Sequence, residues 1–204
     1  MADYSKELGA WAEALATVKL PRWQALPTLA LYMDQVVAYI NESLAFILAD
    51  PNPDAPAQKG KKEDRLLTAA MINNYVKQHF IPKPQKKRYQ REHLACLIVY
   101  ALLKQVLPLS DIQKGVAVQL ALNGGDFAKA YDMFCDQVEH SLAAVAELAQ
   151  GKMAGDAFCP DRSHDTLGTS MAALSLASKL LAQKVLALNS VSGELSQVFI
   201  DDDK

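Results

Sequence analysis

The chain has 204 residues, of which 50% are hydrophobic and 22% are charged, with a formal net charge of −2. This apolar content supports a packed core and excludes a disordered or collagen-like chain, and the length favours one domain or two small ones. Three cysteines without a CxxC pair argue against a disulfide scaffold or a zinc finger. The N-terminus lacks the apolar segment of a signal peptide, and Lys179 and Lys184 interrupt the most apolar stretch. We therefore expect a cytoplasmic protein that does not cross a membrane.

Apolar residues recur at steps of three and four along most of the chain, which predicts a mostly α-helical fold. A first helix is expected over about 5–18. A second, long helix is expected to end near Leu48, with one face formed by Leu31, Val36, Ile40, Leu44 and Ile47. Residues 50–64 contain three prolines and no bulky apolar side chain, so we expect a mobile loop there.

The second half of the chain repeats this helical pattern. Thr68 is the expected N-cap of a helix that reaches about His79, and residues 81–90 form at most a short β-hairpin. Further helices are predicted over 91–106, from a cap at Ser110, over 127–148 after the turn at 123–126, and over 169–188. Residues 151–168 are expected to be irregular.

Basic side chains are concentrated between Lys59 and Arg91, which we call the basic segment. It holds ten Lys and Arg residues and two acidic ones, a net charge of +8; the remainder holds 11 basic and 21 acidic residues, a net charge of −10. Such a region attracts polyanions by Coulomb steering and counterion release. For Lys59, Lys61 and Lys62 alone, a solvated loop explains the charge equally well.

The predicted helix over 68–79 within the basic segment is amphipathic. Its apolar side holds Ile72, Val76, His79 and Phe80, flanked by Met71 and Tyr75. Its opposite side holds Asn73, Asn74, Lys77 and Gln78. Asn and Gln amides pair with adenine edges, and Lys reaches guanine or phosphate, so this face suits a DNA major groove. An ordinary solvated helix face is the alternative.

A stiff loop over 82–91 follows this helix. Pro82 and Pro84 restrain its backbone, and it carries the cations Lys83, Lys86, Lys87, Arg88 and Arg91. A restrained basic loop beside a recognition helix can hold phosphates on either side of a groove. We expect Tyr89 to pack beneath the loop.

Several motifs in this region resemble the MerR-type DNA-binding domain, which has a helix-turn-helix, a wing and two further helices. Residues Met71–Pro82 resemble its recognition helix and the exit from it, and Arg88-Tyr89 resembles the end of its wing. The starts of its two later helices are similar to Glu92-His93-Leu94 and Leu107–Ile112. The resemblance implies a winged helix-turn-helix that reads the major groove with helix 68–79 and phosphates with loop 82–91.

Over about residues 18–118 the chain also resembles an uncharacterised bacterial family without an assigned function, on the motifs Leu20–Trp23, Leu31–Val36 and Met71–Pro84. Some 20 residues separate the two helices of the expected helix-turn-helix, where MerR proteins have a tight turn. We divide the chain into an N-terminal helix and linker (1–28), a MerR-like domain (29–118) and a C-terminal helical region (119–204) for dimerisation or an effector.

The sequence shows no motif of an enzyme. It contains no HExxH, Walker A, dinucleotide or GxSxG pattern. A sensor built from Cys135, His140, Cys159 and His164 can be imagined, but zinc sites have tighter local ligand pairs, and incidental burial is the favoured explanation. We therefore predict no catalytic residues, no metal and no cofactor.

These observations favour a DNA-binding transcriptional regulator whose partner is double-stranded DNA. The residues expected to contact DNA are Asn73, Asn74, Lys77, Gln78, Lys83, Lys86, Lys87, Arg88 and Arg91. A homodimer would span two half-sites. The alternative is a protein-interaction adaptor in which the basic loop meets an acidic partner; any small-molecule effector remains unspecified by the sequence.

Overall fold

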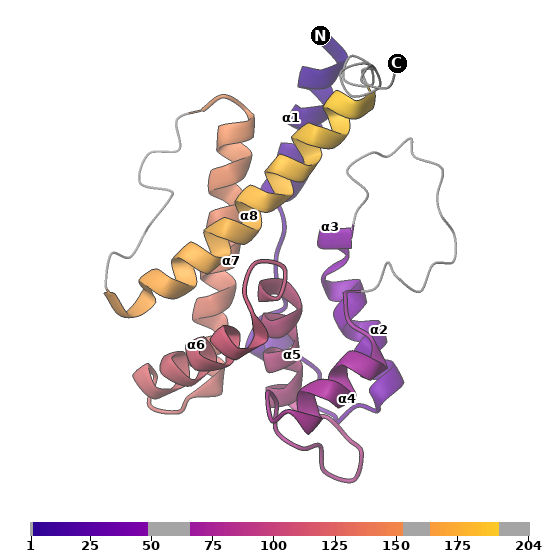
Figure 1. Ribbon diagram of the computed structural model, residues 1–204, viewed down its shortest axis with the longest axis vertical. Helices are drawn as coiled ribbons and strands as arrows, with labels where there is room; N and C mark the ends of the chain where they lie inside the picture. The colour runs from indigo at the N-terminus through magenta and orange to yellow at the C-terminus, as the bar shows by residue number, and fades with distance from the viewer. Residues whose placement is uncertain (1, 49–65, 153–163, 192–204) are drawn as a thin grey trace, which may run out of the picture.

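The computed structural model describes residues 2–48, 66–152 and 164–191, which fold into helices without a named β-strand (Figure 1). The helices are α1 (Ala2–Ala16), the 3-10 helix η1 (Trp23–Ala25), α2 (Met33–Ser43), α3 (Ala45–Leu48), α4 (Ala69–Lys77), α5 (Arg91–Leu103), α6 (Leu109–Leu122), α7 (Phe127–Ala149) and α8 (His164–Val191). The expectation of a mostly α-helical fold is confirmed.

Helix α5 is the centre of the fold. Every residue from His93 to Leu103 is buried, and the helix is apolar on all sides. A helix of this kind must be covered by other elements all round. Helices α2 and α4 cover it in the lower part of Figure 1, while α6, α7 and α8 pack against its other side.

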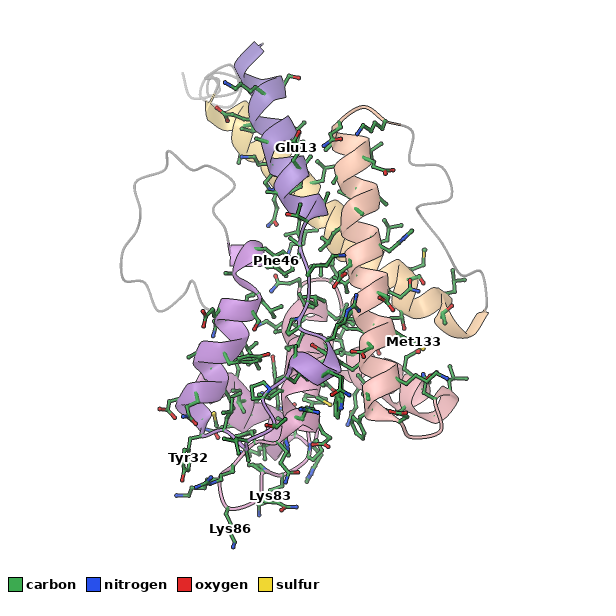
Figure 2. The ribbon with its side chains drawn as sticks, turned by 180° about the vertical axis from the view of Figure 1, so that it is seen from behind. Glu13, Tyr32, Phe46, Lys83, Lys86 and Met133 are labelled. Carbon is green, nitrogen blue, oxygen red and sulfur yellow. The ribbon has the colours of Figure 1, made fainter. Side chains whose placement is uncertain are left out.

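The upper part of the molecule is a three-helix unit. Helix α7 packs against α1, which lies beside its upper part, and against α8, which crosses it at an angle (Figures 1 and 2). The apolar stripe of α7 predicted from the sequence is buried: Tyr131, Phe134, Val138, Leu142 and Val145. The turn that precedes α7 is confirmed, since Gly124 and Gly125 have φ of 64° and 82° and Asp126 caps the helix.

The segment between α1 and η1 is hydrogen-bonded to one carboxylate of α7. Glu139, whose side chain is 7% exposed, accepts hydrogen bonds from Lys19 Nζ (2.8 Å), Leu20 N (2.9 Å) and Arg22 (3.0 Å). Arg22 also pairs with Asp136 at 2.9 Å. Because a buried carboxylate is stabilised only where charge and hydrogen bonds satisfy it, this cluster fixes how the N-terminal segment lies on α7.

The prediction of one long helix ending near Leu48 is wrong in two respects. Leu31 lies outside the helix and is paired in extended conformation with Tyr89. Leu44, with φ −111° and ψ 19°, interrupts the helix and separates α2 from α3. Its fully buried side chain keeps its place in the core, so the apolar period continues across a break in the backbone.

Several predicted boundaries also differ from the structure. Helix α4 ends at Lys77 and α5 at Leu103, because the last turns adopt tighter turn geometry. Ser110 lies inside α6, whose N-cap is Pro108, so the predicted cap is wrong and the helix is longer than expected. Helix α8 begins at His164, five residues earlier than predicted. The loop expected over 50–64 lies outside the described residues.

Helix α8 is, by length and composition, long and apolar enough to cross a membrane over Thr166–Leu188, with a hydropathy of 1.4. The same test is passed by core helices of globular proteins. In this structure α8 packs against α7, Lys184 is buried, and Lys179 Nζ donates to Gln105 near the end of α5 (3.2 and 3.3 Å). Helix α8 thus packs against the other helices with part of its surface, and 33% of this apolar window is buried inside the fold.

Candidate nucleic-acid interface

Helix α4 is set on α2 by hydrogen bonds at its start. The side chain of Asn41 in α2 donates to the Leu67 carbonyl (2.8 Å) and accepts from the Leu67 N–H (3.1 Å). Thr68 then caps α4, accepting from Met71 N at 3.3 Å, as the sequence predicts. These contacts fix where α4 begins and how it is rotated.

The C-terminal end of α4 is held on α5 by three aromatic rings. The rings of Tyr75 and Phe80 lie 5.6 and 5.9 Å from the ring of Tyr100, which is fully buried in α5. Ile72 and Tyr75 are buried. One face of α4 is therefore immobilised in the core, and its opposite face is left to solvent.

All four predicted contact residues of α4 lie on its solvent face: Asn73, Asn74, Lys77 and Gln78 are exposed. Gln78 Nε2 donates to Asn74 Oδ1 at 3.0 Å, which orients the Asn74 amide along the helix surface. His79, placed on the apolar side by the sequence pattern, is exposed instead. It has φ 60° and follows the helix as its left-handed end, where Phe80 N donates to the Tyr75 carbonyl at 2.9 Å.

The loop after α4 is a tight turn with two lysines at its tip. Arg88 N donates to the Gln85 carbonyl at 2.8 Å, and Lys86 and Lys87 between them have φ of 48° and 61°. Two central residues with positive φ are typical of a type I′ hairpin turn, where Asn and Gly are favoured. Lysine there is strained, at a cost of roughly 1–2 kcal/mol per residue. The expected hairpin is thus reduced to a bridged turn.

The base of this turn is joined to the segment before α2. Leu31 and Tyr89 exchange two backbone hydrogen bonds of 2.9 Å. Tyr89 is 3% exposed and meets the ring of His93 edge-on at 5.6 Å, which confirms that it packs beneath the loop. The turn therefore projects from a fixed base.

Two aromatic residues that the sequence analysis did not select hold the arginines of the loop. The Arg88 guanidinium lies 4.7 Å from the Tyr32 ring centroid and donates to the Tyr32 hydroxyl at 2.7 Å. Arg91 lies 5.6 Å from the ring centroid of Trp23. Figure 2 shows Tyr32, Lys83 and Lys86 together at one end of the molecule. No local sequence pattern could have pointed to Tyr32, because its partner Arg88 is 56 residues away in the chain.

The surface formed by α4 and this loop is cationic and free of acid within its own sequence. Residues 66–91 contain Lys77, Lys83, Lys86, Lys87, Arg88 and Arg91 and no Asp or Glu. None of these six forms an ion pair with another described residue. We call these six cations and the amides of Asn73, Asn74 and Gln78 the α4–loop surface. It presents unneutralised charge beside amide donors and acceptors.

A buried histidine lies beneath the loop. His93 is 5% exposed, and its Nδ1 accepts from Gln90 N at 3.0 Å, at the start of α5. Burial lowers the pKa of His93, although the charge of Glu92 opposes the shift. The ring is therefore neutral where the loop is folded over it.

The other residues singled out from the sequence are not assembled into a site by the described structure. Lys59, Lys61, Lys62 and Cys159 lie outside the described residues. Cys135 is fully buried, and burial raises the pKa of its thiol to about 12, so it is held as an unreactive thiol. Among the described residues no group of three or more His, Cys, Asp and Glu side chains is placed to hold a metal ion.

A family model described as a domain of unknown function, DUF1836, matches residues 21–145. The chain belongs to the DUF1836 family. No curated protein and no solved structure matches the chain. The DUF1836 region contains the whole α4–loop surface, its partners Tyr32 and Trp23, and Glu139, whereas Lys19 and Leu20, which bind Glu139, and the helices α1 and α8 lie outside it.

Proposed function

We propose that this protein is a DNA-binding transcriptional regulator that inserts α4 into the major groove of double-stranded DNA. The observation that carries the proposal is the α4–loop surface: an exposed amide face on an immobilised helix, followed by a turn that holds two lysines in a strained backbone. The strained backbone bears on function, because an Asn-Gly pair would adopt the same two positive φ values at lower energy than two lysines. Lysine at both positions is explained by a partner that binds cations.

In this arrangement the residues have two roles. Asn73, Asn74, Lys77 and Gln78 face base edges, where amides discriminate adenine and lysine reaches guanine. The loop cations Lys83, Lys86, Lys87, Arg88 and Arg91 bind phosphates and fix the register of the protein on the duplex. As a helix of nine residues, α4 extends about 14 Å, a length that a major groove admits. The proposal includes a helix-turn-helix formed by α2 and α4 and a wing formed by the loop.

The test is a fluorescence-polarisation titration of the full chain against random duplex DNA over a range of salt concentrations. Replacing Lys86, Lys87 and Arg88 by Ala should weaken binding at low salt and reduce the slope of log K against log salt by about 2 to 3, about 0.9 for each phosphate contact. The matched control replaces three exposed lysines elsewhere, Lys6, Lys129 and Lys152, by Ala. Equal effects of the two triple variants, or no effect of the first, would contradict the proposal.

A protein-interaction adaptor is the second candidate, and one observation favours it. Tyr32, 47% exposed, contacts Arg88 of the basic loop, and Leu29, 80% exposed, lies two residues before the Leu31–Tyr89 pairing. Exposed aromatic residues next to arginine are common at protein interfaces. Under this alternative, Leu29→Ser would abolish capture of an acidic protein partner, and the chain would show little affinity for duplex DNA. Under the regulator proposal, Leu29→Ser leaves the salt slope for duplex DNA unchanged.

A further inference from the structure

We infer that the cavity between α5, α6, α7 and the first turns of α8 is a binding site for a small, uncharged, largely apolar molecule. The cavity has a volume of about 270 Å³. An engineered cavity of about 150 Å³ binds benzene, and pockets for drug-sized ligands begin near about 300 Å³. The space therefore suits a molecule of two or three fused or linked rings, or an aliphatic chain of similar bulk.

The chemistry of the walls selects an uncharged ligand. Among the residues that the structure describes, apolar side chains such as Val99, Leu103, Ile112 and Phe134 form most of the lining, and no Lys, Arg or His contributes to it. The one carboxylate among the described lining residues, Asp111, pairs with Lys114 at 3.1 Å. Cys96 also lines the cavity, and burial raises the pKa of its thiol to about 11, so it remains uncharged. Among the described wall residues, an anion would find no cation, and a cation would find only a carboxylate that is already paired.

Two glycines within helices border this cavity. Gly115 in α6 and Gly168 in α8 line the space, both are exposed, and a Cβ added at either would meet no atom within 4 Å. Glycine inside a helix is less stable than alanine, so a site with room for a side chain would ordinarily carry one. Both positions therefore have room for a larger side chain at the edge of the cavity.

The position of the cavity links it to the rest of the fold. Its α5 wall is formed by Ala95, Cys96, Val99 and Leu103, on the helix that begins at Arg91 directly after the basic loop. Its α8 wall lies outside the DUF1836 region, whereas the other three walls lie within it. The site thus joins the family domain to the C-terminal helix of this chain.

The experiment uses the full chain and two fluorescent probes that share one skeleton. N-phenyl-1-naphthylamine is uncharged, and 8-anilinonaphthalene-1-sulfonate adds a sulfonate. We expect saturable binding of the uncharged probe at one site per chain, and binding of the sulfonate at least tenfold weaker at 0.5 M salt, where surface lysines are screened. Indole, followed by ligand-observed NMR, serves as a smaller uncharged probe. Absence of saturable binding by both uncharged probes, or equal binding of the sulfonate, would overturn the inference.

Substitutions then locate the site. Gly115→Leu should weaken binding of the uncharged probe at least tenfold, and Gly168→Leu, which fills the space from α8, should do the same. Gly9→Leu is the matched control, since Gly9 also lies within a helix with nothing within 4 Å of an added Cβ, but in α1 and away from the cavity. Circular dichroism verifies that each variant is folded. Unchanged binding in a folded Gly115→Leu or Gly168→Leu protein, or equal loss in Gly9→Leu, would place the probe elsewhere and refute the site.

Discussion

The guanidinium of Arg88 donates a 2.7 Å hydrogen bond to the hydroxyl of Tyr32 and lies 4.7 Å from the centroid of its ring. These residues come from opposite sides of the bridge between Leu31 and Tyr89, so a single backbone pairing brings the start of α2 to the basic loop. The contact holds a flexible cation in one orientation on an exposed surface. Because immobilising a long side chain costs entropy, an arginine held in place before binding loses less when it meets a phosphate.

Tyr32→Phe is therefore expected to weaken duplex DNA binding about three- to tenfold, since it removes a hydrogen bond of about 1 kcal/mol that orients Arg88 and leaves every charge in place. Fluorescence polarisation at fixed salt measures the change. Tyr39→Phe, in helix α2 that Tyr32 precedes, is the control and should bind as the wild type does. An affinity that does not change in Tyr32→Phe would show that the orientation of Arg88 contributes nothing.

The strained turn predicts opposite effects on stability and binding. Changing Lys86 to Asn and Lys87 to Gly installs the residues that positive φ favours, and should raise the free energy of unfolding by about 1 kcal/mol, or the Tm by about 2–4 °C. The same variant should bind duplex DNA more weakly, with a salt slope lower by about 2. Thermal denaturation and the salt titration measure the two effects. A variant that is more stable and binds equally well would exclude the tip of the turn from the interface.

The amide face predicts a change in selectivity. Asn73→Ala and Asn74→Ala should each lower discrimination between preferred and random duplexes about tenfold, because a bidentate contact to a base contributes about 1–3 kcal/mol. Binding to random duplex should change little, since the loop cations remain. Selection of bound sequences from a random pool supplies the preferred duplex, and Gln150→Ala, beyond the end of α7, is the control. Equal losses on both duplexes would assign these amides to packing or general affinity.

The buried His93 should make the stability of the protein sensitive to acid. Burial lowers the pKa of His93 in the folded protein, whereas the unfolded chain titrates near about 6.5. Unfolding therefore takes up a proton below that pH, and the stability that neutral His93 permits is present above about pH 6.5 and is lost as the pH falls toward the folded pKa. His93→Gln keeps an acceptor for Gln90 N and cannot titrate in this range.

Urea denaturation at pH 7.5, 6.5 and 5.5 measures this effect. The free energy of unfolding of the wild type should fall more steeply than that of His93→Gln between pH 6.5 and 5.5. Parallel curves for the two proteins would mean that His93 accepts its proton without disturbing the fold.

The contacts of Glu139 between the N-terminal segment and α7 should contribute to the free energy of unfolding. Glu139→Gln removes the charge that Lys19 and Arg22 share and should lower the free energy of unfolding by about 2 kcal/mol, because Arg22 retains Asp136 and both cations retain water. Chemical denaturation measures it. Glu147→Gln, on the exposed side of α7, is the control and should be within about 0.5 kcal/mol of the wild type.

Much of the local structure was predictable because it depends on neighbouring residues. The spacing of Ile72 and Tyr75 against Asn73, Asn74, Lys77 and Gln78 determined which face of α4 is exposed, and Thr68 marked its start. The predicted apolar stripe of α7 is buried for the same reason: a helical period of 3.6 places residues three and four apart on one side. The break at Leu44 was not predictable, since its side chain continues the apolar pattern while the backbone turns.

By itself, then, the sequence determined the helical class, the polar face of α4 and the separation of positive charge from an acidic body. Only the tertiary structure decided that Leu31 pairs with Tyr89, that Tyr32 holds Arg88, and that four helices line a half-open cavity with glycines at its rim. Those features join residues far apart in the chain. No local period encodes such contacts, because they depend on how whole elements pack, and packing is settled by the summed burial of many side chains at once.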